Sequence, residues 1–151
     1  MNTLLKIRAM TAEDVPAVSE IEKTCFNDAW SENLIKGELD NGNAVVFVAQ
    51  YRENVVGYIN FYNIVGEGNI NRIAVLPQCR KQGIADALMK AMLGWAKENK
   101  LVFVTLEVRQ SNTAAISLYR KYGFENVGIR KNFYSAPVED AVLMTLDGEK
   151  I

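Results

Sequence analysis

The sequence predicts a mixed α+β domain built on one mostly antiparallel sheet, and three observations lead to that class. The chain has 151 residues, of which 49% are hydrophobic and 23% are charged, so it can bury one sizeable core. Short runs rich in β-branched and aromatic residues alternate with segments of helical periodicity. Residues 70–109 read as strand, helix and strand, with the length of a parallel crossover. We therefore expect a single domain over residues 1–151 with this βαβ unit at its centre.

The N-terminal half is expected to contain two helices and an antiparallel strand pair. Thr11 and Ser31 are residue types that cap helix N-termini, and each precedes apolar residues at helical spacing. Phe26 and Trp30 lie between the two helices and fit either aromatic packing, the commoner case, or the mouth of a substrate site. The expected elements are a strand at 4–8, helices at 11–25 and 31–39, a helix end at 41–43, strands at 44–51 and 55–62, and a loop at 65–68.

A strand, a basic turn and a helix follow one another in residues 69–96. The apolar run from Ile70 to Leu76 is ended by Pro77, which cannot donate a hydrogen bond to a sheet. The basic loop 78–82 leads to Gly83, after which apolar side chains recur at three- and four-residue spacing. The period therefore changes from strand to amphipathic helix at Gly83.

This turn has the features of an anion-binding site. The first turn of a helix leaves N–H groups unpaired and carries partial positive charge. Gly83 lets an anion approach the backbone, and Arg80 and Lys81 add full charges. The same features fit an ordinary strand-to-helix connection with solvated basic residues. Neither the dinucleotide pattern G-x-G-x-x-G nor a Walker loop occurs, so a nucleotide-binding function is disfavoured.

The composition excludes several classes of mechanism. The chain has no histidine, which excludes Ser-His-Asp and Cys-His catalysis and histidine metal sites. Cys25 and Cys79 form no ligand cluster, so we expect no metal. A net charge of −1 argues against direct nucleic-acid binding. Without a secretory signal or a long apolar run, a cytoplasmic protein without a membrane segment is expected.

The second half carries a carboxylate and a tyrosine that could do acid–base chemistry. Glu107 lies in the apolar strand expected at 101–109, where burial would raise the pKa of its carboxyl group and suit it to act as a base. Spacing alone favours a simpler explanation, an exposed strand end or an ion pair with Arg109 or another cation. Tyr119 shares a helix face with Asn112 and could be a proton donor or a core tyrosine. The remaining expected elements are a helix from 111 to 122 ended by Gly123, and strands at 124–129 and 141–146 joined by 131–139.

Two motifs in these segments resemble the GCN5-related N-acetyltransferases (GNAT). Arg80-x-x-Gly83-x-Ala85, after the 73–77 run, is similar to the acetyl-CoA-binding segment of that family. L-E-V-R-x-S-N-x-x-A-x-x-L-Y-x-x-x-G-F at 106–124 is similar to the RimI-type ribosomal-protein-alanine N-acetyltransferases. The chain is also similar to that group at 7–14, 21–31 and 130–141. The resemblance implies a GNAT-like domain with helices on both faces of the sheet and a βαβ core that binds the cofactor.

The resemblance also implies a mechanism and a set of site residues. Acetyl-CoA would be the co-substrate, with Glu107 as general base and Tyr119 as general acid. The residues implied to bind acetyl-CoA are Ile73, Ala74, Val75, Lys81, Gln82, Gly83, Ile84, Ala85, Asp86 and Asn112.

The implied substrate is the N-terminal α-amine, on alanine, of a small-subunit ribosomal protein. Tyr134 is the candidate wall for this peptide, or else a packed loop aromatic. A small amine, a polyamine or a lysine side chain is an alternative acceptor, and a non-catalytic acyl-CoA-binding module is an alternative class that intact Glu107 and Tyr119 disfavour. The chain departs from the family pattern at Ala85, at Asn27 and Ala29, and at Phe133, and the departures at 27, 29 and 133 bear on peptide fit.

Overall fold

One seven-stranded mixed sheet organises the protein, and the computed structural model describes residues 4–151 of it. The strand order is β1-β2-β3-β4-β5-β7-β6, and only the β4–β5 pair is parallel, as the sequence predicts. The strands are β1 Leu5–Ala9, β2 Ala44–Tyr51, β3 Asn54–Ile64, β4 Glu67–Val75, β5 Phe103–Arg109, β6 Glu125–Tyr134 and β7 Glu139–Asp147.

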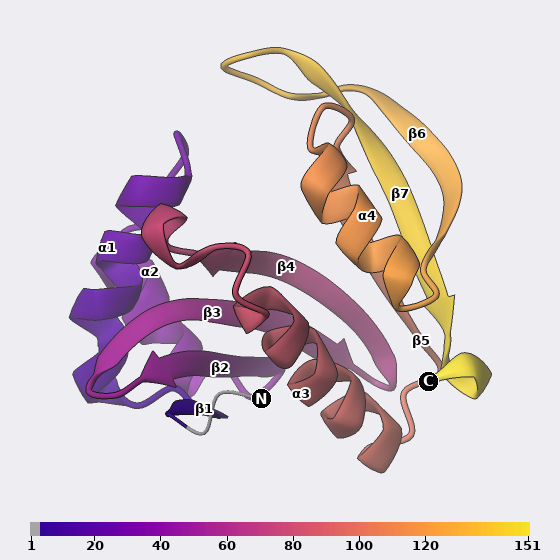
Figure 1. The fold of residues 1–151 in the computed structure, drawn as a ribbon. Coiled ribbons are helices and arrows are strands. Elements are labelled where there is room, and N and C mark those ends of the chain that lie inside the picture. The colour runs from indigo at the N-terminus through magenta and orange to yellow at the C-terminus, as the bar shows by residue number, and fades with distance from the viewer. Residues whose placement is uncertain (1–3) are drawn as a thin grey trace.

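Helices cover both faces of this sheet (Figure 1). The helices are α1 Val15–Cys25, α2 Glu32–Gly37, α3 Ile84–Glu98 and α4 Thr113–Lys121, with short 3-10 turns η1 Ala12–Asp14, η2 Glu38–Asp40, η3 Pro77–Cys79 and η4 Gly148–Lys150. α1 and α2 pack on one apolar cluster, and α3 and α4 pack on a larger cluster across the sheet. The predicted α+β class and layer arrangement are therefore confirmed. No helix within residues 4–151 is long and apolar enough to cross a membrane.

The predicted caps account for where several helices begin and end. The Thr11 N–H donates to the Asp14 carboxylate, which starts η1 immediately before α1. The Leu34 N–H donates to the Ser31 hydroxyl at the start of α2, 3.1 Å away. Beyond α4, Gly123 has φ +96°, a left-handed conformation that glycine adopts without strain.

Several strand ends differ from the prediction, and the differences near residues 65–76 and 129–134 bear on the site. The loop expected at 65–68 is only a two-residue turn, because Val65 and Gly66 both have positive φ and Glu67 already begins β4. β4 ends at Val75 rather than Leu76, which precedes the turn η3. β6 continues to Tyr134 instead of ending at Ile129, since its outer residues pair with β7 up to Glu139. This longer hairpin carries Tyr134 toward the end of the sheet where the parallel strands separate.

Candidate active site

The two parallel strands separate partway along their length. β4 pairs with β5 only from Glu67–Ile70 against Phe103–Leu106. Beyond these residues β4 continues to pair with β3, and β5 with β7. The sheet therefore opens between its β1–β4 half and its β5–β7 half (Figure 1).

A β-bulge lies at the point of separation. Phe61 of β3 pairs with Ile70 and Asn60 pairs with Arg72, so Asn71 is an extra residue in β4. The Asn71 side-chain amide donates to Asn60 Oδ1 at 2.9 Å, and Asn69 donates to Asn71 Oδ1 at 2.7 Å. Because a bulge bends its strand, these contacts stabilise the bend that directs β4 away from β5.

A cleft of about 730 Å³ occupies the opening between the two halves. Five of the residues predicted for catalysis or binding line it: Ile73, Glu107, Asn112, Tyr119 and Tyr134. The rest of the lining comes from the end of α1 and the α1–α2 connection, the bulge, the end of β5, the start of α4 and the β6–β7 hairpin, including Cys25, Phe26, Asn27, Asp28, Asn71, Arg72, Arg109, Phe133 and Glu139. Phe26 thus both packs against its neighbours and borders the cleft, whereas Trp30 is only packed.

Glu107 enters the cleft from one face of β5. Its neighbours Leu106 and Val108 are buried in the cluster under α3 and α4, so Glu107 points to the opposite face. Its side chain is 31% exposed, and its Oε1 lies 4.0 Å from the Arg130 guanidinium. The carboxylate is therefore partly exposed and paired with a cation, and that cation is not Arg109, which pairs with Glu139 at 3.2 Å.

Tyr119 reaches the cleft from the other face. Its ring packs against Phe124 with centroids 5.8 Å apart, and the residue is only 5% exposed. Burial, and then the nearby Tyr134, raise the pKa of the Tyr119 hydroxyl above its usual value, so it stays protonated at neutral pH. This hydroxyl has no hydrogen-bond partner among residues 4–151. It is a neutral proton donor available to a molecule in the cleft.

Tyr134 lies between charged side chains on the hairpin side of the cleft. The Arg109 guanidinium lies 4.5 Å from its ring centroid, and Phe133 packs edge-on at 5.0 Å. Burial, and then the Glu107 carboxylate, raise the pKa of Tyr134, while Arg109 and Arg72 oppose that shift. Tyr134 is therefore a packed aromatic residue that lines the same cleft as Glu107.

The predicted anion-binding turn lies outside this cleft, at the N-terminus of α3. Gly83 has φ +80° and Lys81 has φ +62°, which turn the backbone into the helix. No side chain from residues 4–151 caps the first turn of α3. The backbone N–H groups of residues 84–86 consequently lack intrahelical partners. The Ile84 side chain is in the core, so only its backbone is available to a ligand.

Two side chains near this turn have partners that the sequence did not indicate. Arg80 donates from Nε to the Val75 carbonyl at 3.0 Å, and its Nη2 lies 3.6 Å from Cys25 Sγ. The Arg80 charge is thus directed at the end of β4, where Ala74 and Val75 are buried. Asp86 accepts hydrogen bonds from Lys121 at 2.6 Å and from the Tyr122 hydroxyl at 2.7 Å. These contacts lower the pKa of Asp86 and connect α3 to α4.

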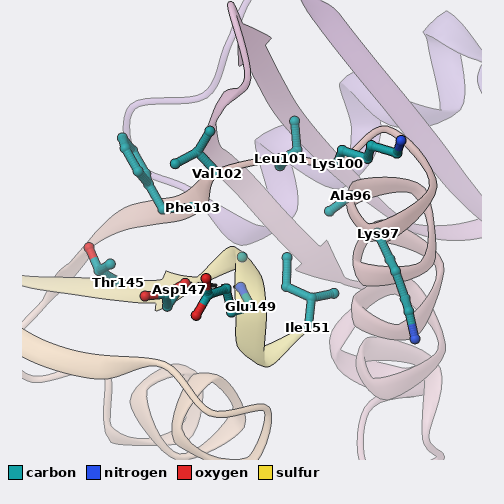
Figure 2. Close-up of a pocket in the computed structure, with 11 residues that line it drawn as sticks. Ala96, Lys97, Lys100, Leu101, Val102, Phe103, Thr145, Asp147, Glu149 and Ile151 are labelled. Atoms are coloured by element: carbon teal, nitrogen blue, oxygen red, sulfur yellow. Dashed lines mark hydrogen bonds between the residues drawn. The ribbon is translucent and has the colours of Figure 1, made fainter.

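A second hollow, of about 840 Å³, lies at the other end of the sheet. Figure 2 shows it between the end of α3, the beginning of β5 and the last residues of the chain, with Leu101 and Ile151 toward its interior. None of the predicted site residues lines it. Although it is larger, it lacks the acid–base pair, so the cleft between β4 and β5 is the candidate active site. No group of three or more His, Cys, Asp or Glu residues in the described chain could hold a metal ion.

Sequence reasoning missed Arg72 and Asp28, which also line the cleft. The signal for Arg72 was its position, because it is a charged residue inside the apolar run 70–76. Asp28 gave no comparable signal, since a polar connection between two helices is ordinary.

Comparison with known proteins agrees with this geometry. Residues 15–124 match the Acetyltransferase (GNAT) family. An N-alpha-acetyltransferase of Sulfurisphaera tokodaii is 36% identical, with 92% of this chain and 90% of that protein covered. A ribosomal protein bS18-alanine N-acetyltransferase of Haemophilus ducreyi is 32% identical, with 93% and 98% covered. The crystal structure of the ribosomal-protein-S18-alanine N-acetyltransferase from Escherichia coli is similar, with a TM-score of 0.88, 28% identity, and 95% and 93% covered. This chain therefore belongs to the GNAT family of N-acetyltransferases, whose acetyl donor is acetyl-CoA.

Proposed function

We propose that this acetyltransferase modifies the N-terminal α-amine of a protein, with Glu107 as general base and Tyr119 as general acid. One observation carries the proposal: a carboxylate and a phenol without a hydrogen-bond partner among residues 4–151 line the same cleft, from opposite faces of the sheet, where the parallel strands separate. An acyl-CoA-binding module needs neither group. The two side chains together therefore favour an enzyme.

Acetyl-CoA, the acetyl donor, would be bound along β4 and at the turn before α3. Ile73 borders the cleft, and Ala74 and Val75 continue the strand away from it, so their backbone groups are candidate partners for the pantetheine arm. The pyrophosphate would contact the unpaired N–H groups at the start of α3, beside Gly83 and the exposed Lys81 and Gln82. The residues of this turn proposed to contact acetyl-CoA are Lys81, Gln82, Gly83, Ile84, Ala85 and Asp86. Asp86 would do so through its backbone N–H, because its carboxylate is held by Lys121 and Tyr122.

Asn112 is suited to contact acetyl-CoA through the nitrogen of its side-chain amide. Its Oδ1 accepts from the Ala115 N–H at 3.1 Å and caps α4. Its amide nitrogen donates to none of residues 4–151 and belongs to a residue that lines the cleft. The cap thus fixes the Asn112 side chain and leaves its amide N–H groups free to donate a hydrogen bond to acetyl-CoA.

The proposed reaction needs three proton transfers within the site and no covalent enzyme intermediate. An α-amine has a pKa of about 7.7–8.0, so modest assistance deprotonates it. Glu107 accepts the ammonium proton, directly or through water, and the neutral amine attacks the thioester carbonyl that acetyl-CoA supplies. The C–N bond forms, the C–S bond breaks, and Tyr119 donates its phenolic proton to the departing sulfur. The attacking nitrogen, which becomes cationic when the C–N bond forms, gives its extra proton to the Tyr119 phenolate and so regenerates the phenol. The proton held by Glu107 returns to solvent, so each turnover releases one proton.

The acceptor is proposed from the substrates that two relatives are named for. The Haemophilus ducreyi and Escherichia coli proteins are named as acetyltransferases of an alanine in a ribosomal protein. We infer the same class of acceptor here, the N-terminal alanine of a small-subunit ribosomal protein. Tyr134 would border the peptide, since it lines the same cleft as Glu107, on the hairpin side.

A panel of amines tests the acceptor. Release of free thiol from acetyl-CoA would be measured with alanine peptides followed by basic residues, the same peptides with blocked N-termini, lysine peptides and free polyamines. We expect release only with open N-termini and a product acetylated on the α-amine. Release only with lysine peptides or polyamines would discard the N-terminal acceptor and retain the chemistry at Glu107. Binding of acetyl-CoA without any release would contradict the catalytic proposal.

A further inference from the structure

Arg72 lies directly after the bulge and is held in a cage of side chains on the α1 face of the sheet. Its Nη2 lies 3.3 Å from Glu22 Oε1 and donates to the Asp28 carbonyl at 3.0 Å. The centre of its guanidinium lies 4.0 Å from the Phe26 ring centroid and 4.9 Å from that of Trp30. The Arg72 side chain is 14% exposed, so these contacts are largely shielded from water.

Glu22 is the centre of this cage. It is fully buried, and it accepts hydrogen bonds from the Trp30 N–H at 2.8 Å and from the Tyr58 hydroxyl. A buried carboxylate is costly unless its oxygens have partners, so Arg72, Tyr58 and the Trp30 N–H are required together. The cage therefore connects β3, β4 and α1 to the segment between α1 and α2.

That segment, residues 26–30, forms one wall of the cleft. Phe26, Asn27 and Asp28 line the cleft beside Arg72, and the lining also includes Tyr134 of the β6–β7 hairpin. Within residues 26–30, the contacts of Phe26, Asp28 and Trp30 described above all lead to Arg72 or to its partner Glu22. Besides the packing of Phe26 and Trp30 on the apolar cluster, the polar and cation–π contacts of this wall thus lead to one arginine of β4.

We propose that Arg72 is a positioning residue for the acceptor amine: it fixes the 26–30 wall of the cleft and thereby governs amine binding, not acetyl-CoA binding. This rests on the proposed location of the amine between Glu107 and that wall. The donor site is proposed on Ile73–Val75 and the turn at Gly83, and none of the cage contacts involves that turn. Loss of the cage should consequently affect the two substrates differently.

The variant Arg72→Lys tests this with little change in net charge. Lysine keeps the attraction to Glu22 but lacks the planar guanidinium, which stacks on Phe26 while its Nη2 donates to the Asp28 carbonyl. The matched control is Arg8→Lys, because Arg8 also pairs with a largely buried carboxylate, Asp14, through contacts of 2.7 and 2.8 Å, but does not line the cleft. Both variants replace a guanidinium that pairs with a buried carboxylate, and only Arg72 adjoins the proposed amine site.

The first readout is steady-state kinetics with whichever amine of the panel is turned over. We expect Arg72→Lys to raise KM for the amine at least about fivefold, with KM for acetyl-CoA within about twofold of wild type. Arg8→Lys should leave both constants unchanged. An unchanged amine KM, or equal rises in both KM values, would overturn the proposal.

The second readout needs no activity, so it separates this proposal from the assignment of the acceptor. Amide hydrogen exchange would be followed by mass spectrometry in peptides covering 26–30 and 81–86. Arg72→Lys should speed exchange in 26–30 at least about tenfold, because Glu22, which accepts from the Trp30 N–H, is no longer held by the guanidinium, while 81–86 exchanges as in wild type. Unchanged exchange in 26–30, or faster exchange throughout the protein, would refute the assigned role even if no amine were acetylated.

Discussion

The substitution Tyr119→Phe separates chemistry from stability in this site. It removes one hydroxyl that has no hydrogen-bond partner among residues 4–151 and leaves the ring packed on Phe124. No buried partner is left unsatisfied, so the free energy of unfolding should change by less than about 0.5 kcal/mol. The proposed proton donor, in contrast, is lost completely.

The expected kinetic loss follows from the role of that proton. General acid–base groups contribute about 10²- to 10⁴-fold, or roughly 2.7–5.4 kcal/mol in the activation barrier. A thiolate with a pKa near 8.5 leaves more readily than most groups, so the lower part of that range applies here. We expect kcat to fall by more than about tenfold, with KM for acetyl-CoA nearly unchanged.

The assay is thiol release at saturating acetyl-CoA, together with thermal denaturation of the same preparations. The matched control is Tyr62→Phe, whose hydroxyl donates to Glu38 at 2.6 Å outside the cleft. It should lose about 0.5–1.5 kcal/mol of stability and keep the wild-type kcat. A Tyr119→Phe enzyme with wild-type kcat would refute the assignment of Tyr119 as the acid.

Three further predictions concern other parts of the site and the fold. Glu107→Gln should lower kcat by more than about tenfold with KM for acetyl-CoA nearly unchanged in the thiol-release assay. Gly83→Ala meets no neighbouring atom within 4 Å but must keep φ near +80°, so calorimetry should detect a loss of about 1 kcal/mol and kinetics a higher KM for acetyl-CoA only. The hydrogen bond from Arg8 lowers the pKa of the Asp14 carboxyl group in the folded protein. The Arg8–Asp14 pair therefore stabilises the fold above the unfolded-state pKa of about 3.9, and this stabilisation is lost as the pH falls through the lower folded-state pKa. Arg8→Gln should therefore reduce Tm at pH 7 more than at about pH 2, as measured by thermal melts.

Much of this architecture was predictable because local signals agreed with one another. Pro77 ends the strand run, Gly83 begins the helix, and the helical spacing after it matches α3. Asn112 and Gly123 likewise mark the two ends of α4. Such positions are determined by backbone chemistry within a few residues, which a sequence displays directly.

The partners of charged side chains were not predictable in the same way. Glu107 pairs with Arg130, 23 positions further along the sequence, and Asp86 is held by Lys121 of α4 and by Tyr122 directly after that helix. Arg80 looked like part of a basic turn, but it donates to a carbonyl of β4. Long flexible side chains choose partners according to tertiary distances, and spacing along the chain does not encode those distances.

The bulge at Asn71 connects the parts of the site that the sequence left separate. In a regular strand Ile70, Arg72 and Ala74 would share a face. Here Ile70 belongs to the cluster under α3, whereas Ala74 belongs to the cluster under α1, because the extra residue reverses the alternation. Without it, the Arg72 guanidinium would face the apolar cluster under α3 instead of Glu22. One inserted residue therefore opens the parallel pair and also turns the arginine toward the wall of the cleft it borders.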